Sequence, residues 1–312
     1  MTIAVIVRGS LNHRGANVEL IKDDYQKMRQ MAPGVFFGLV TSSTLNPVSI
    51  AALSGIFDLI ITSKYKADSA LSPGMNSIIR QAKQVEEMLA QVPDDVGHVL
   101  MLRTDFRILS PEVLWAKTTS HFSKLKGIGV LNFNGARLPI MPMPYHISDL
   151  MFLATLSDLE RLWGGVSKWD TSKEQISRWN SRRLLSYVGQ SKYSAEQMLW
   201  RAYFMGSPFP PKASRLRGGE IETAWKQTQT LSHYSPFELG LSGPSEFFTR
   251  SRIAGLFYGL SKPPKNNFIM RSVSQISAVI GNYLFIFHPH WLVPRIRGWK
   301  NGLKDSFLTI RQ

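Results

Sequence analysis

Residues 99–105, which read Val99-Leu100-Met101-Leu102-Arg103-Thr104-Asp105, decide the fold expected of this chain. Four apolar residues in succession are typical of a strand buried in a sheet. The run ends at an arginine, and an aspartate follows two residues later. In an open α/β sheet, ligands bind in the crevice outside the carboxyl ends of the strands. We therefore expect Arg103 and Asp105 to lie at a ligand-binding edge.

Apolar runs alternate with helical patterns through the first 135 residues, as is typical of a parallel sheet built from βαβ units. In the clearest helical pattern, apolar residues recur at steps of three and four from Met75 to Val92, and a weaker pattern covers Val18 to Met28. These patterns predict an α/β fold with an open, mostly parallel sheet and flanking helices. The expected strands are Ile3 to Val7, Val35 to Thr41, Asp58 to Ser63, Val99 to Phe106 and Gly129 to Asn134.

The alternation stops after residue 135, where a stretch with prolines at 139, 142 and 144 indicates a long ordered loop. Two matches to the S/T-x-x-E/Q capping box predict helix starts, one at Ser157 with Glu160 and one at Ser194 with Gln197. The chain therefore divides into an α/β half at 1–135, a more helical second half at 136–249 and a tail at 250–312.

The composition predicts an anionic partner. The 312 residues include 37 Lys and Arg against 22 Asp and Glu, so the formal net charge is +15, and the tail alone carries ten cations against one anion. Nucleic acid, a phosphorylated substrate or the inner face of a membrane would each suit this charge. The chain has no cysteine, which excludes disulfides, thiolate metal sites and cysteine nucleophiles.

The basic tail contains 23 uncharged residues from Ser272 to Pro294, long enough to raise the question of a membrane span. Its many polar residues make it a poor one. Large aromatic residues among arginines and lysines favour a segment that lies on a bilayer, and the alternative is a buried core segment with a solvated basic rim. At the N-terminus, the apolar run before Arg8 is too short for a signal peptide.

Several well-known catalytic motifs are missing. The first expected strand is not followed by Gly-x-Gly-x-x-Gly, and the chain contains no P-loop, no Gly-x-Ser-x-Gly elbow and no His-Glu-x-x-His pair. The Arg103 and Asp105 pair therefore carries the hypothesis. A strand-terminal carboxylate can hold a divalent cation or bind a sugar hydroxyl, and an arginine can bind phosphate oxygens. The alternative is an aspartate that only forms a turn or caps a helix.

Five short segments carry a family resemblance: Val7-Arg8-Gly9, Asn76 to Gln81, Leu102 to Asp105, Tyr145 to Asp149 and Ala195 to Gln197. In their order and spacing they resemble the WavE lipopolysaccharide synthesis family, whose members look like glycosyltransferases of the GT-A type. The resemblance implies that 1–135 binds a nucleotide-sugar donor and that 136–249 binds the acceptor. It also implies sugar transfer to a lipid-linked saccharide in the assembly of lipopolysaccharide, O-antigen or capsule.

The sequence departs from ordinary GT-A enzymes where those have Asp-x-Asp, because the first acid is replaced by Arg103. One carboxylate binds a divalent cation less firmly than two. Dependence on Mg²⁺ or Mn²⁺ held by Asp105 is therefore left open, and Arg103 is an alternative source of positive charge.

The resemblance assigns donor binding to residues of three segments. Arg8 follows the first strand, and Arg80 shares the polar face of its helix with Asn76, so these side chains are placed to reach the nucleotide or its phosphates. For either arginine the alternative is a solvated surface charge. The expected donor-binding residues are Arg8, Gly9, Asn76, Arg80, Arg103 and Asp105.

On the acceptor side, Asp149 is the preferred general base, because we expect it to open a helix just past the proline-containing loop. Glu196, in the first turn after Ser194, is the second candidate. For both acids the alternative is favourable electrostatics at a helix N-terminus without a catalytic role. His146 is expected to bind the acceptor or a metal, with a hydrogen-bonded structural histidine as the alternative.

Three functions remain open from the sequence. The first is a cytoplasmic glycosyltransferase held by its tail to the inner face of the plasma membrane. The second is a basic nucleic-acid-binding protein, which is not favoured because the charge excess lies in an apolar segment and no nucleic-acid module is recognised. The third is a non-catalytic scaffold with a glycosyltransferase fold.

Overall fold

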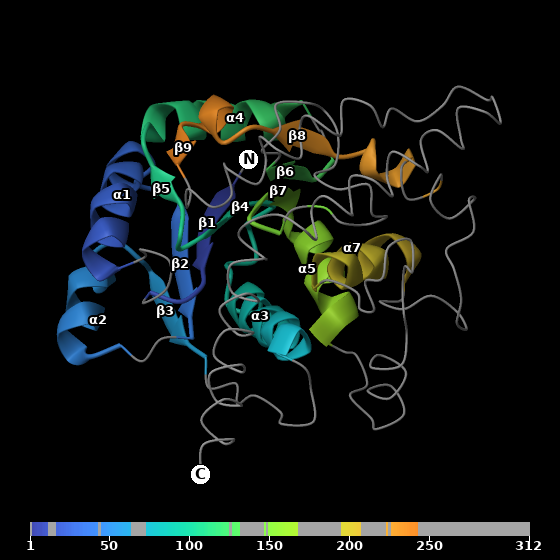
Figure 1. Cartoon of the computed structure of the whole chain (residues 1–312). Coiled ribbons are helices and arrows are strands. Elements are labelled where there is room, and N and C mark those ends of the chain that lie inside the picture. The colour runs from blue at the N-terminus through green and yellow to red at the C-terminus, as the bar shows by residue number, and fades with distance from the viewer. Residues whose placement is uncertain are drawn as a thin grey trace, which may run out of the picture.

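The computed structural model describes ten segments of the chain, which together form an α/β fold. A sheet of seven strands forms the centre, and helices cover both of its faces (Figure 1). The described residues are 2–11, 17–42, 45–63, 73–124, 127–131, 147, 149–167, 195–206, 223 and 226–242.

The large sheet has the strand order β3-β2-β1-β4-β7-β6-β8. Strand β7 runs antiparallel to its neighbours β4 and β6, and every other neighbouring pair is parallel. The mostly parallel sheet predicted from the sequence is thus confirmed. Its strands are β1 (Ile3–Arg8), β2 (Phe36–Thr41), β3 (Leu59–Thr62), β4 (His98–Arg103), β6 (Gly129–Leu131), β7 (Met151–Thr155) and β8 (Ser232–Tyr234), and a separate two-stranded sheet pairs β5 (Arg107–Ile108) with β9 (Leu241–Ser242).

Two hydrophobic cores enclose the sheet, one on each face. Alternate residues of β1 divide between them: Ile6 packs in the core with α3, α5 and α7, whereas Val5 and Val7 pack in the core with α1 and α4. Such full burial is why this strand reads as an unbroken apolar run. The helices are α1 (Val18–Met31), α2 (Pro47–Ser54), α3 (Pro73–Leu89), α4 (Pro111–Ser123), α5 (Leu156–Ser167) and α7 (Ala195–Met205), with a 3₁₀ turn η1 (Phe237–Leu239).

The strands of the first half lie where the sequence predicts them, with shifts at their ends. Strand β4 ends at Arg103 and not at Phe106, and residues 132–134 of the last expected strand lie outside the described residues. Thr104 and Asp105 form a turn that leaves the sheet. The expected helix from Met75 corresponds to α3, and its periodic apolar residues from Ile78 onward are buried.

The prediction that Asp149 opens a helix is wrong. Asp149 precedes strand β7, and the helix α5 begins only at Leu156. The capping box is also displaced, because the hydroxyl of Thr155 accepts the N–H of Asp158 at 3.1 Å and donates to the Asp158 carboxylate at 2.8 Å. Thr155, and not Ser157, therefore caps α5.

The start of α7 at Ala195 agrees with the second predicted helix start, although Ser194 lies outside the described residues. No helix in the described part of the chain is long and apolar enough to cross a bilayer. The segment from Ser272 to Pro294 and the whole tail lie outside the described residues.

Candidate functional site

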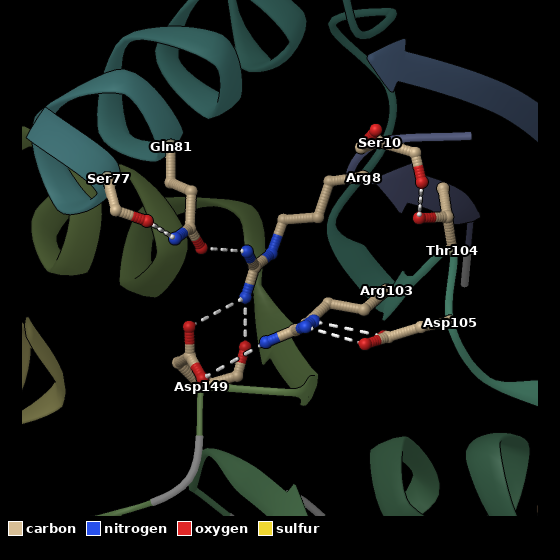
Figure 2. A network of polar contacts seen from close by, with 8 residues as sticks. All are labelled: Arg8, Ser10, Ser77, Gln81, Arg103, Thr104, Asp105 and Asp149. Carbon is tan, nitrogen blue, oxygen red and sulfur yellow. Dashed lines mark hydrogen bonds and ion pairs between the residues drawn. The ribbon is translucent and has the colours of Figure 1, made fainter. Parts of the chain in front are cut away.

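Four charged side chains predicted from the sequence, those of Arg8, Arg103, Asp105 and Asp149, meet at one edge of the sheet (Figure 2). Arg8 and Arg103 end the parallel strands β1 and β4 and are register partners. Asp149 arrives at the same edge because β7 is antiparallel, so that its start lies beside the carboxyl end of β4, with Met151 opposite Leu102. This is the edge at which open α/β sheets bind ligands.

Arg8 is a buried arginine, with only 3% of its side chain exposed. Its Nη1 donates to Gln81 Oε1 at 2.5 Å, and its Nη2 donates to the backbone carbonyl of Asp149 and lies 3.5 Å from Asp149 Oδ2. The guanidinium carbon also lies 4.8 Å from the centre of a Trp163 ring, in cation–π contact. Ser77 fixes Gln81 in turn by accepting a hydrogen bond from its amide at 3.1 Å.

The surroundings of Arg8 set its charge state. Burial lowers the pKa of Arg8 to about 10, and the neighbouring Asp149 carboxylate opposes this shift. The guanidinium therefore stays protonated at neutral pH. Arg8 is therefore not a solvated surface charge, and its contact with the donor stays a prediction.

Arg103 is the accessible cation of the site, with 21% of its side chain exposed. Its Nε donates to Asp105 Oδ1 at 3.1 Å and its Nη2 to Asp105 Oδ2 at 2.6 Å, a bidentate pair. Its Nη1 also faces Asp149 Oδ1 at 4.0 Å. Arg103 thus bridges the two carboxylates of the edge.

The backbone around these side chains is held by two adjoining turns. Gly9 has a φ of +136°, and a Cβ added there would lie 2.5 Å from Thr104 Oγ1. Thr104 Oγ1 donates to the carbonyl of Ser10 at 2.9 Å, and the N–H of Thr104 donates to the carbonyl of Arg8 at 2.9 Å. Only glycine fits this conformation and this close approach. Gly9 therefore serves the site through its backbone.

The described residues do not fit a divalent cation. Both Asp105 oxygens accept hydrogen bonds from Arg103, and each Asp149 oxygen faces a guanidinium. No group of three or more histidines and acids in the described part of the chain is placed to hold a metal ion. A cation bound by Asp105 would have to displace Arg103 and approach two positive charges.

The other predicted residues are less fully described. Arg80 lies on α3 next to Gln81, and its buried Nε has no hydrogen-bond partner among the described residues. Asn76 lies in α3 and Glu196 in α7, at positions whose side chains are not described. His146 lies outside the described residues. The second half of the chain contributes to the same sheet through β7 and β8, and the division into donor and acceptor parts stays a prediction.

Two groups of the site were missed at the sequence level. Gln81 lies at the end of a segment that carried the family resemblance, and its spacing of four from Ser77 places both on one helix face. Trp163, fully buried on α5, reads only as a core residue in the sequence. The spacing of Ser77 and Gln81 can be recognised in the sequence, whereas the contact of Trp163 with the site depends on how α5 packs.

No family model matches the chain, and no curated protein matches it. A 4-diphosphocytidyl-2C-methyl-D-erythritol synthase structure from Anaerococcus prevotii is similar, with 10% identity, 73% of this chain and 96% of that chain covered, and a TM-score of 0.35. The structure of TarS from S. aureus is similar at 12% sequence identity, with 73% of this chain and 39% of that chain covered and a TM-score of 0.38. A glycosyltransferase involved in the glycosylation of the major capsid of PBCV-1 is similar at 8% sequence identity, with 81% of this chain and 100% of that chain covered and a TM-score of 0.38. These structures are too distantly similar to assign an activity to this chain.

Proposed function

We propose that this chain is a glycosyltransferase that moves a sugar from an activated, nucleotide-linked donor to a saccharide acceptor. The observation that carries the proposal is the pairing of an accessible guanidinium, Arg103, with a carboxylate, Asp149, at the carboxyl edge of the parallel strands. The resemblance of the sequence to the WavE family points to the same activity.

The geometry supports a division of labour between these two groups. In the transfer step the acceptor oxygen forms a bond to the anomeric carbon while the bond from that carbon to the diphosphate breaks. The proton of the acceptor hydroxyl passes to a carboxylate, for which Asp149 is the preferred base and Glu196 the alternative. Arg103 stabilises the negative charge that grows on the departing diphosphate.

Arg8 acts on the reaction through Asp149 and not on the ligand. It donates to the Asp149 backbone and lies beside its carboxylate, while Gln81 and Trp163 hold the guanidinium in place. This arrangement keeps the Asp149 carboxylate, whose side chain is only 9% exposed, compensated by a positive charge. Arg8 is therefore a positioning residue in the proposed mechanism.

The finer parts of the proposal rest on the sequence. They are a lipid-linked saccharide acceptor, a role in lipopolysaccharide, O-antigen or capsule assembly, contact of His146 with the acceptor, and attachment of the tail to the cytoplasmic face of the plasma membrane. A lipid-linked acceptor must be met at a bilayer surface, and a basic aromatic segment suits that location.

A screen of nucleotide sugars by thermal unfolding of the full chain tests the proposal. A ligand that binds only the folded state stabilises it by about 2.7 kcal/mol at 100 times its Kd. We expect one nucleotide sugar to raise the melting temperature of the wild type and of Glu87→Gln, an exposed acid on α3, but to stabilise Arg103→Gln less.

The contradicting outcome is a chain that no nucleotide sugar stabilises and that binds polynucleotides in a salt-sensitive way. That result would favour the nucleic-acid hypothesis. Stabilisation without any transfer to saccharide acceptors would favour the non-catalytic scaffold.

A further inference from the structure

We propose that the site binds the diphosphate of its donor through the Arg103 guanidinium and without a divalent cation. This inference rests on the proposed function, and it specifies which group neutralises the negative charge of the donor diphosphate. It follows from how the two carboxylates and two guanidiniums of the edge are already paired.

The carboxylate best placed to hold a metal is engaged. Asp105 is a bidentate partner of Arg103, at 3.1 and 2.6 Å, and only 4% of its side chain is exposed. A divalent cation needs carboxylate oxygens that are turned toward it. Binding one here would require Arg103 to release both oxygens.

The second carboxylate also faces guanidiniums. Asp149 Oδ2 lies 3.5 Å from Arg8 Nη2, and Asp149 Oδ1 lies 4.0 Å from Arg103 Nη1. The four side chains carry two positive and two negative charges, so their net charge is zero. A metal ion added between them would find each carboxylate already neutralised by a guanidinium and would gain little net attraction.

The exposed part of Arg103 is where a diphosphate would contact the site. Arg8 is enclosed by Gln81 and Trp163 and is 3% exposed, whereas Arg103 is 21% exposed at the same edge. Asp105 occupies the Nε and Nη2 edge of Arg103, so the proposed diphosphate contact is with the Nη1 and Nη2 end of the same guanidinium, which keeps its charge at any physiological pH. Asp105, by pairing with Nε and Nη2, fixes the direction in which Arg103 points.

The test is calorimetric titration of the full chain with UDP, GDP, CDP, ADP and pyrophosphate, first in EDTA and then with Mn²⁺. We expect at least one nucleoside diphosphate to bind in EDTA and Mn²⁺ to leave its affinity unchanged. Arg103→Gln should weaken that binding by roughly 10- to 100-fold, the effect of losing a hydrogen bond to a charged group. The control Lys117→Gln, on the exposed side of α4, should bind as the wild type does.

A second readout follows the metal alone. The electron paramagnetic resonance signal of free Mn²⁺ should persist when wild-type chain is added. Arg103→Asp restores two acids at the strand end, and we expect this variant to bind Mn²⁺ and to lose metal-free binding of the diphosphate. If Arg103→Asp does not fold, as judged by circular dichroism, the wild-type and Arg103→Gln titrations still decide the matter.

The failures are distinguishable. Binding that appears only with Mn²⁺, or that survives Arg103→Gln unchanged, overturns this inference and leaves the glycosyltransferase proposal standing. Failure of every diphosphate to bind in either buffer overturns both.

Discussion

Arg8 and Arg103 stand opposite each other in the register of β1 and β4, yet only Arg103 reaches solvent. Arg8 turns under the sheet edge, where it packs against Trp163 and holds Asp149. Arg103 turns outward, where it holds Asp105. The same residue type at equivalent positions therefore holds a buried carboxylate in one strand and, in the proposed function, binds the ligand in the other.

Replacing the buried arginine should destabilise the fold. In Arg8→Met, the Asp149 carboxylate loses its buried partner, and breaking such a pair from one side costs about 3–5 kcal/mol. We expect urea denaturation to show a loss of that size. Lys117→Met, at an exposed position of α4, is the control and should unfold as the wild type does. Equal midpoints for Arg8→Met and the wild type would mean that Arg8 does not support Asp149.

Removing the partner of Arg103 should abolish transfer without unfolding the chain. Asp105→Asn takes away the carboxylate that directs the guanidinium, so Arg103 is no longer fixed toward the diphosphate. We expect no detectable release of nucleoside diphosphate in the presence of acceptor, with an unchanged circular dichroism spectrum. Substantial remaining turnover would remove Asp105 from the site.

The two candidate bases are separable by kinetics. Asp149→Asn should lower kcat by roughly 10²- to 10⁴-fold, the usual contribution of a general base, and leave the Kd for the donor diphosphate nearly unchanged. Glu196→Gln, measured in parallel, should leave kcat close to the wild-type value. The reverse pattern would make Glu196 the base.

Attachment through the tail predicts a charge-dependent affinity for vesicles. Each lysine or arginine near an anionic surface contributes about 1 kcal/mol, so replacing Arg295, Arg297 and Lys300 by serine should weaken binding roughly 100-fold. Co-sedimentation with phosphatidylserine vesicles measures this, with phosphatidylcholine vesicles as the control. If the variant and the wild type sediment alike, the tail is not an electrostatic anchor.

Stability should fall on mild acidification because of two histidines. Burial lowers the pKa of His233, whose Nε2 donates to the Thr228 carbonyl at 3.1 Å, and burial also lowers the pKa of His98. The unfolded chain then binds more protons below about pH 6.5, so these residues add stability above that pH and lose it as the pH falls. Melting temperatures at about pH 7.5 and pH 5.5 should differ less for His98→Gln/His233→Gln than for the wild type. An equal difference would contradict this assignment.

The first half of the fold was predictable because its signals are local. Buried strands read as apolar runs and α3 reads as a regular repeat, so neither depends on knowing a distant partner. Strand β7 was missed although Leu150 to Ala154 is an apolar run, because a helix was expected to begin at Asp149. Its antiparallel direction is set by pairing with β4, about fifty residues earlier, and is not a local signal. Helices α2 and α4 were also missed, and their Asn46-Pro47 and Ser110-Pro111 starts are readable signals.

The residues of the site also differ in how far the sequence predicts their positions. Arg103 and Asp105 were placed correctly at the sheet edge, because the end of a strand can be read from where its apolar run stops. The burial of Arg8 was not predictable, since it depends on Gln81 and Trp163 from two helices that meet only in the folded chain. Asp149 reached the edge by an antiparallel strand and not by the helix expected for it.

The left-handed backbone of Gly9, with the Thr104 hydroxyl where a methyl group would stand, leaves no room for any other amino acid. Relatives that preserve both turns must preserve this glycine, however far the remainder of their sequences has drifted. It offers a fixed point from which distant alignments can be anchored, directly after the first strand and independent of any assumption about substrate.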